Sequence, residues 1–114
     1  MSKEPIVYLK HIRDEILYIS SVITPDFYKD IFLRDETLKR AIVRSLEIIG
    51  EATKKIPADF KLKWNTIQWK KMAGMRDKLI HDYMGVNYNI IWDVIKNKIP
   101  ELKLQIDEVI EKTK

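Results

Sequence analysis

Three side chains with reactive chemistry lie close together in the segment AGMRDKLIHDYMGV, residues 73–86. They are Arg76, His81 and Tyr83. A histidine has an ordinary pKa of about 6.5, so it can transfer protons near neutral pH. The guanidinium group of an arginine matches phosphate oxygens and can stabilise charge that develops on phosphorus. A tyrosine adds a nucleophilic hydroxyl group. One interpretation of the segment is therefore an active site.

Each of the three residues also has an ordinary structural interpretation. Arg76 can be an exposed arginine paired with a carboxylate, His81 a histidine favoured by a helix C-terminus, and Tyr83 an aromatic ring at a bundle edge. Arg76 and Tyr83 share a face of an ideal helix, whereas His81 lies about 140° around the axis from Arg76. The flexible arginine stem, fraying near Gly85 or a second subunit could bring them together. The residue types alone leave both interpretations open.

The elements that position these residues are predicted to be helices. Apolar residues recur at spacings of three and four, as in an amphipathic helix, and no strand-like alternation is present. We expect an all-α, antiparallel bundle of about five to six helices with short connections. The predicted segments are a helix from Pro5 to about residue 23, a short turn at 27–32, and helices at 36–56, 67–84, 87–99 and from 100 onward.

Capping residues mark the ends of these helices. Asp35 is a good N-cap, and Pro57 should end the helix that Asp35 begins. We expect a loop at residues 57–65, a C-cap at Gly85, an N-cap at Asn87 or Asn89, and a last helix opening at Pro100. Gly74 lies in mid-helix at a cost of about 1 kcal/mol relative to alanine, which suggests that another backbone approaches it closely.

A charged stripe runs along the helix predicted at 36–56. Its members follow one another at spacings of four, three and four: Arg40, Arg44, Glu47 and Glu51. The simpler interpretation is a ladder of ion pairs on a solvated face, worth about 0.2–0.5 kcal/mol per pair. The functional interpretation is that Glu47 or Glu51 holds Arg76 or His81 across the bundle.

Composition limits the classes of protein that fit. The chain has 114 residues, enough for one domain spanning residues 1–114, and a formal charge of +4. A basic excess fits a nucleic-acid partner, although lysine-rich solvated helices give the same charge. Without cysteine, and with only two distant histidines, a metal centre is not expected, and neither is a cofactor. We see no signal peptide or membrane-spanning run, and we expect a soluble cytoplasmic protein.

Two longer segments resemble a known family. MAGMRDKLIHDYMGVNYNIIWDVI, residues 72–95, is similar to the signature of the HepT-like toxins of the HEPN superfamily, and RAIVRSLEIIGEATKKIP, residues 40–57, resembles the helix that precedes it. The core of the signature is R-x-x-x-x-H-x-Y, filled here by Arg76, His81 and Tyr83. The flanking matches make it specific, and the likeness covers nearly the whole chain.

The resemblance implies a homodimeric helical bundle with the two motif helices lining a shared cleft. It implies the toxin of a prokaryotic, type VII-like toxin–antitoxin pair, acting as a metal-independent endoribonuclease with Arg76 and His81 as the catalytic pair. Asp77 fills the polar position that the superfamily often places after the arginine. The implied antitoxin is a minimal nucleotidyltransferase that attaches AMP to Tyr83. The alternatives are a non-catalytic HEPN dimer that binds a nucleotidyltransferase or a nucleotide, and a purely structural helical protein.

The chemistry of these residue types agrees with the implied activity. RNA carries its own nucleophile, the 2′-hydroxyl group beside each phosphodiester, so a metal-bound water is not required. We expect cleavage by attack of this hydroxyl, which leaves a 2′,3′-cyclic phosphate and a 5′-hydroxyl group. AMP on Tyr83 would block the site by its bulk and by repulsion between like charges.

Overall fold

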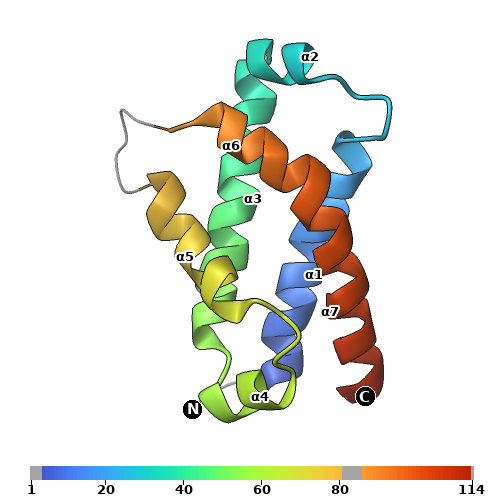
Figure 1. The fold of residues 1–114 in the computed structure, drawn as a ribbon, viewed down its shortest axis with the longest axis vertical. Helices are drawn as coiled ribbons and strands as arrows, with labels where there is room; N and C mark the ends of the chain where they lie inside the picture. The colour runs from blue at the N-terminus through green and yellow to red at the C-terminus, as the bar shows by residue number, and fades with distance from the viewer. Residues whose placement is uncertain (1–3, 81–85, 114) are drawn as a thin grey trace.

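The computed structural model describes residues 4–80 and 86–113, and for Arg76, Leu79 and Ile80 it describes the backbone alone. The expected all-α bundle is confirmed (Figure 1). In chain order the elements are α1 (Pro5–Val22), α2 (Lys29–Arg34), α3 (Glu36–Lys55), α4 (Ala58–Lys63), α5 (Trp69–Ile80), α6 (Tyr88–Asp93), a π-helix η1 (Val94–Lys98) and α7 (Ile99–Thr113). The expected end of α5 at Gly85 lies outside the described residues.

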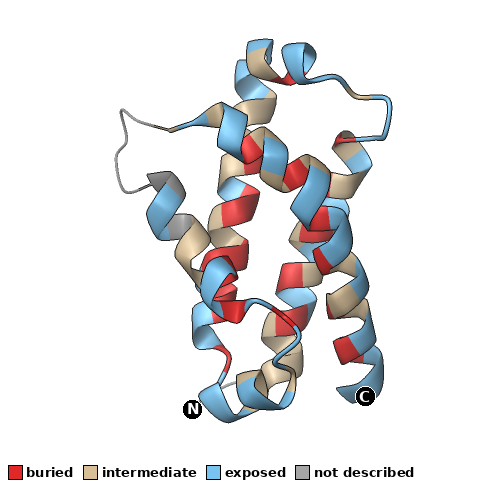
Figure 2. Ribbon diagram, in the orientation of Figure 1, coloured by how far each residue is buried: buried red, intermediate tan, exposed pale blue. Residues whose placement is uncertain are grey.

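The core is formed by the apolar faces of the three long helices. α1 packs against both α3 and α7, and α5 packs against the opposite side of α3. Figure 2 shows the buried residues gathered on the facing sides of these helices. Among the side chains with no exposed surface are Leu9, Ile12, Ile16, Ile19, Phe32, Ile42, Leu46, Ile49, Ile91 and Ile106. None of the described helices is long and apolar enough to span a bilayer.

The expected cap of α3 is confirmed. The Asp35 carboxylate accepts a hydrogen bond from the backbone N–H of Leu38 at 2.9 Å, which satisfies one of the otherwise unpaired donors of the first turn. α3 ends at Lys55, two residues before Pro57. The helix with the clearest apolar repeat in the sequence therefore has the boundaries that Asp35 and Pro57 predict.

The loop expected at residues 57–65 is wrong, because this segment contains α4. Pro57 is the N-cap of α4, and its carbonyl oxygen accepts the N–H of Lys61 at 3.2 Å. The Phe60 ring packs against Trp64 and Trp69, with ring centroids 6.4 Å apart in both pairs. A helix of six residues is too short to show a periodic apolar pattern, so tertiary packing of the aromatic ring decides its structure.

The last helix begins at Ile99, next to the expected Pro100, but no loop precedes it. The N–H of Ile99 bonds to the carbonyl oxygen of Val94, five residues back, in the wider turn of a π-helix. A proline within an α-helix lacks the N–H donor and its ring collides with the carbonyl group four residues earlier. The wider turn immediately before Pro100 relieves that conflict, so α6, η1 and α7 follow one another without a break.

A lysine in η1 ties this continuous helix to the connection between α1 and α2. The Lys96 ammonium group donates hydrogen bonds to the carbonyl oxygens of Thr24 at 3.1 Å, Pro25 at 3.0 Å and Phe27 at 3.4 Å. The same nitrogen lies 5.5 Å from the centroid of the Trp92 ring, within the range of a cation–π interaction. Lys96 therefore stabilises a contact between segments about seventy residues apart.

We predict that Lys96→Met lowers the free energy of unfolding by about 1–3 kcal/mol, because hydrogen bonds from a charged donor are lost while the aliphatic stem remains. Urea unfolding followed by circular dichroism measures the change. The matched control is Lys112→Met, which removes an exposed ion pair with Glu108 in the last turns of α7 and should cost less than about 0.5 kcal/mol. Equal losses in the two variants would contradict the assigned role of Lys96.

Candidate active site

Two adjacent helices carry the described candidate residues. α3 bears Glu47 and Glu51, and α5 bears Asp77 and the backbone of Arg76. The two helices pack side by side, as Figure 1 shows for the green and yellow segments. His81 and Tyr83 lie outside the described residues, immediately beyond the last described residue of α5. The described candidate residues therefore lie on neighbouring helices.

A direct ion pair joins α3 to α5 at this region. The Lys54 ammonium nitrogen lies 3.3 Å from one carboxylate oxygen of Asp77 and 3.5 Å from the other. Asp77 directly follows Arg76, so this contact helps to set the rotation of α5 about its axis at the position of the candidate arginine. Both side chains are substantially exposed, and exposed ion pairs of this kind contribute about 0.2–1 kcal/mol.

Lys54 is a residue that the sequence interpretation missed. Its signal was present, since it follows Glu51 by three residues and extends the charged stripe of α3 by one more step. The three-and-four spacing predicts that Lys54 lies on the face of the stripe, but not that it contacts Asp77.

The ladder interpretation of the stripe is confirmed at one position. Arg44 and Glu47 form an ion pair of 3.5 Å between turns of α3, and the Glu47 side chain is only 26% exposed. Glu51 is exposed on the same helix. The expected contact of Glu47 or Glu51 with Arg76 or His81 stays a prediction. Within residues 4–80 and 86–113, no cluster of three or more histidine, aspartate or glutamate side chains could hold a metal ion.

A groove of about 730 Å³ runs between α5 and the continuous helix formed by α6, η1 and α7. Its lining mixes apolar side chains with charged ones, including Met72, Met75, Ile90, Lys78 and Lys98. Gly74 also lines the groove, and a Cβ atom added there would meet no heavy atom within 4 Å. The expected close approach of another backbone to Gly74 is therefore wrong for the described part of this chain.

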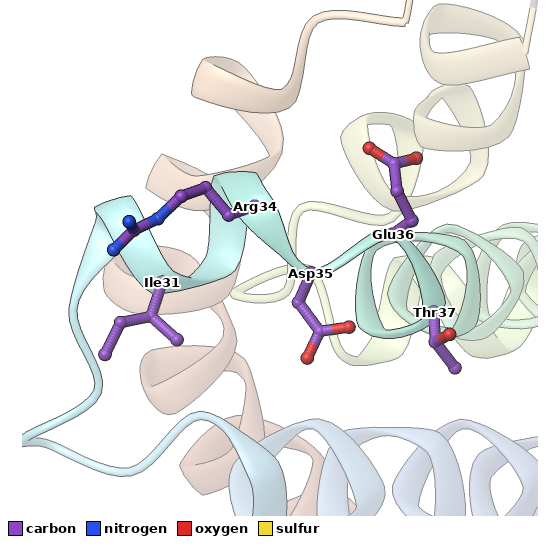
Figure 3. A pocket seen from close by; sticks show the side chains of 5 residues that line it. All are labelled: Ile31, Arg34, Asp35, Glu36 and Thr37. Carbon is purple, nitrogen blue, oxygen red and sulfur yellow. The ribbon is translucent and has the colours of Figure 1, made fainter.

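A second, shallower hollow lies where α2 meets α3 (Figure 3). Figure 3 shows the Arg34 and Glu36 side chains pointing away from each other, so they do not converge on a common ligand. Asp35 caps α3, and a hydrogen bond from Lys39 at 2.8 Å, together with its positive charge, lowers the pKa of Glu36 below its ordinary value. These contacts stabilise the start of α3, and the hollow needs no functional explanation.

Comparison with known proteins identifies a family that matches most of the chain, including the candidate segment. Residues 11–109 match the family described as "Ribonuclease HepT-like". A protein of Caldanaerobacter subterraneus subsp. tengcongensis named "Putative RNase" is 49% identical over 112 residues, covering 98% of this chain and 99% of the relative. The "Probable ribonuclease HepT" of Thermococcus cleftensis is 43% identical, covering 90% of this chain and 92% of the relative. No solved structure matches the chain.

Proposed function

Because the chain belongs to the HepT-like ribonuclease family, we propose that it is a metal-independent endoribonuclease with Arg76 and His81 as its catalytic pair. The observation that carries this proposal is the match over residues 11–109, which spans the whole R-x-x-x-x-H-x-Y segment. The relatives named as ribonucleases align with nearly the full chain, so the likeness is not confined to one motif.

The proposed reaction uses a nucleophile that the substrate supplies. His81 takes the proton of the 2′-hydroxyl group, the 2′-oxygen bonds to the adjacent phosphorus, and the bond from phosphorus to the 5′-oxygen breaks. The departing 5′-oxygen takes a proton from water, and the His81 imidazolium returns its proton to the solvent. The products are a 2′,3′-cyclic phosphate and a 5′-hydroxyl group. The Arg76 guanidinium, a bidentate match for phosphate, stabilises the added negative charge on the phosphoryl oxygens.

Asp77 is proposed as a positioning residue in this reaction. Its carboxylate binds Lys54 on α3 at 3.3 Å and therefore resists rotation of α5 next to Arg76. Glu47 and Glu51 are proposed to support the site from α3, as the charged stripe predicts. These three carboxylates also lower the local positive charge, so binding of the anionic substrate must depend on cations elsewhere on the surface.

We predict that His81→Ala lowers RNA cleavage about 10²–10⁴-fold in excess EDTA, because general acid–base catalysis is lost. Gel assays of an RNA oligonucleotide measure the rate, after mass spectrometry has shown that the protein carries no AMP. The matched control is His11→Ala, since His11 is an exposed histidine on α1 and its removal should leave the rate unchanged.

Replacement of the single 2′-hydroxyl at the cut site by hydrogen should abolish cleavage at that site. Equal cutting of RNA and of this deoxy substrate would refute attack by the 2′-oxygen. If unmodified protein cuts no RNA but still binds a nucleotidyltransferase or a nucleotide, the non-catalytic HEPN dimer becomes the better description.

The proposed control of the enzyme is transfer of AMP to Tyr83 by a minimal nucleotidyltransferase acting as antitoxin. Support comes from the position of Tyr83, two residues after His81 in the matched segment. The transfer joins the phenol oxygen to the α-phosphorus of ATP and releases pyrophosphate. The added phosphate then repels the phosphates of RNA, and the adenosine occupies space beside the catalytic pair.

We predict that Tyr83→Phe prevents AMP addition, because phenylalanine lacks the accepting oxygen, and leaves cleavage resistant to the antitoxin and ATP. Intact-mass spectrometry and the cleavage assay are the two measurements. Tyr28→Phe is the control, since Tyr28 is 66% exposed at the start of α2 and its loss should not prevent modification. An adduct of undiminished yield on Tyr83→Phe would assign the modification to another residue.

The proposed assembly is a homodimer in which a second copy of this chain packs along the groove beside α5. Two features support this choice: the groove is partly apolar, and Gly74 faces open space despite the cost of glycine in a helix. Close approach of the partner's backbone would explain the missing side chain. The proposed dimer also brings the two motif segments together, which resolves the separation of about 140° between Arg76 and His81 within one helix.

We predict opposite effects of Gly74→Ala on the fold and on the dimer. Alanine should raise the free energy of unfolding of a monomer by about 0.5–1 kcal/mol, because it favours the helix and its Cβ meets no heavy atom within 4 Å among the described residues. It should weaken dimerisation at least about tenfold, measured by analytical ultracentrifugation across a dilution series. The control is Asp14→Ala, at an exposed position of α1 that does not line the groove. Dimerisation unaffected by Gly74→Ala would place the interface elsewhere.

A further inference from the structure

The positive charge of the chain is concentrated in one segment. Residues 54–71, KKIPADFKLKWNTIQWKK, contain six lysines and one aspartate, a formal charge of +5, whereas the other 96 residues together carry −1. We call these six lysines the basic corner; they are Lys54, Lys55, Lys61, Lys63, Lys70 and Lys71. The net charge of +4 is therefore a local property of one part of the surface.

The structure gathers the basic corner at one end of the bundle. The segment forms the end of α3, all of α4 and the start of α5. In Figure 1 the end of α3 and α4 lie at the bottom, and the start of α5 lies above them. Five of its lysines are exposed, and Lys61 is half-buried. Figure 2 shows that the ribbon of α4 is mainly exposed, and α4 has no buried residue. The exposed lysines other than Lys54, which binds Asp77, are thus available to a large ligand.

A packed aromatic base supports the corner. The Trp69 indole N–H donates to the carbonyl oxygen of Trp64 at 3.0 Å, and the Phe60 ring packs between the two indoles. Lys63 lies above the Trp64 ring, with its nitrogen 5.6 Å from the ring centroid. These contacts fix the backbone of α4, so the positions from which its lysines project are set before a ligand binds.

The basic corner leads directly to the candidate active site. Lys54 contacts Asp77, the residue after Arg76, at 3.3 Å. Lys70 and Lys71 stand at the start of α5, only about 8–9 Å along the helix axis from Arg76 at a rise of about 1.5 Å per residue. A ligand held by the corner can therefore extend along α5 to the catalytic pair.

We propose that the basic corner binds the phosphates of the substrate RNA strand beside the scissile bond. This proposal rests on the proposed ribonuclease function and names the surface that holds its substrate. Lysine binds phosphate as a point charge and without sequence preference. Lysine is depleted in protein–protein interfaces, so a surface made of six lysines fits a polyanion better than a protein partner. Cations here also offset the acidic side chains beside Arg76.

The test removes three exposed lysines of the corner that form no ion pair within residues 4–80 and 86–113, in Lys55→Ala/Lys63→Ala/Lys70→Ala. Lys71 is kept because it lines the groove proposed for the dimer. The matched control removes three exposed lysines outside the corner, in Lys10→Ala/Lys29→Ala/Lys112→Ala. Binding of a fluorescent single-stranded RNA is measured by anisotropy between 50 mM and 500 mM KCl, in a His81→Ala background so that the probe stays intact. Circular dichroism confirms that both triple variants are folded.

We expect the corner variant to lose about 2 from the slope of log K against log salt, at about 0.7 for each lost phosphate contact with a single strand. At 150 mM KCl its Kd should rise at least about tenfold, and the control variant should match the parent. In proteins that retain His81, the corner variant should raise KM by a similar factor with kcat within about twofold of the parent.

Unchanged Kd and salt slope in the corner variant would overturn the proposal. So would a variant that keeps its RNA affinity but no longer accepts AMP from the nucleotidyltransferase, because the corner would then dock that protein. The two proposals can fail separately. A parent protein that binds RNA through the corner but cuts no RNA would refute only the ribonuclease activity. Cleavage with an unchanged KM in the corner variant would refute only the assigned binding surface.

Discussion

The packing of α3 between α1 and α5 is the contact on which the rest of the structure depends. Ile42, Leu46 and Ile49 have no exposed surface, and small residues follow toward the end of α3, including the buried Gly50. Burial of one aliphatic side chain contributes about 1.5–3 kcal/mol, several times more than any exposed ion pair near the site. The core therefore determines where α5 lies, and Lys54 and Asp77 only adjust its rotation.

Lysine has two distinct uses in this fold. Lys39 and Lys96 direct their ammonium groups to backbone carbonyl oxygens and aromatic rings, and both stabilise connections between helices. The lysines of α4 and the start of α5 are mostly exposed and form no part of the core. The net charge of the chain cannot distinguish these two uses, because every lysine contributes one positive charge in either case. Only the surroundings of each ammonium group show which ones can meet a ligand.

Much of this arrangement follows from the sequence, and the exceptions have physical reasons. The three-and-four spacing and Asp35 predict α1 and α3 well because long helices repeat their pattern several times. The sequence does not predict α4, because six residues are too few to repeat the apolar pattern of a helix. It does not predict the π-turn either, because that turn depends on what α6 and α7 pack against. For the site, the sequence predicts the residue types and their order along the chain. It does not predict the Lys54–Asp77 contact, which depends on how two helices are rotated against each other.

The π-helix η1 also sets which side of the following helix, α7, faces the core. Buried isoleucines at 91, 95 and 99 follow at two successive steps of four, which in a regular α-helix would drift about 80° around the axis. The wider turn absorbs that drift, so the later buried residues Leu102 and Ile106 continue on the core side. A π-turn amounts to one extra residue in an α-helix, and its removal would rotate all of α7 by about 100° relative to α6. Regular α-helical winding of the same residues would therefore turn Leu102 and Ile106 away from the core. Loss of one exposed residue such as Asn97 would instead leave the three isoleucines at steps of four and three, the spacing of a regular α-helix.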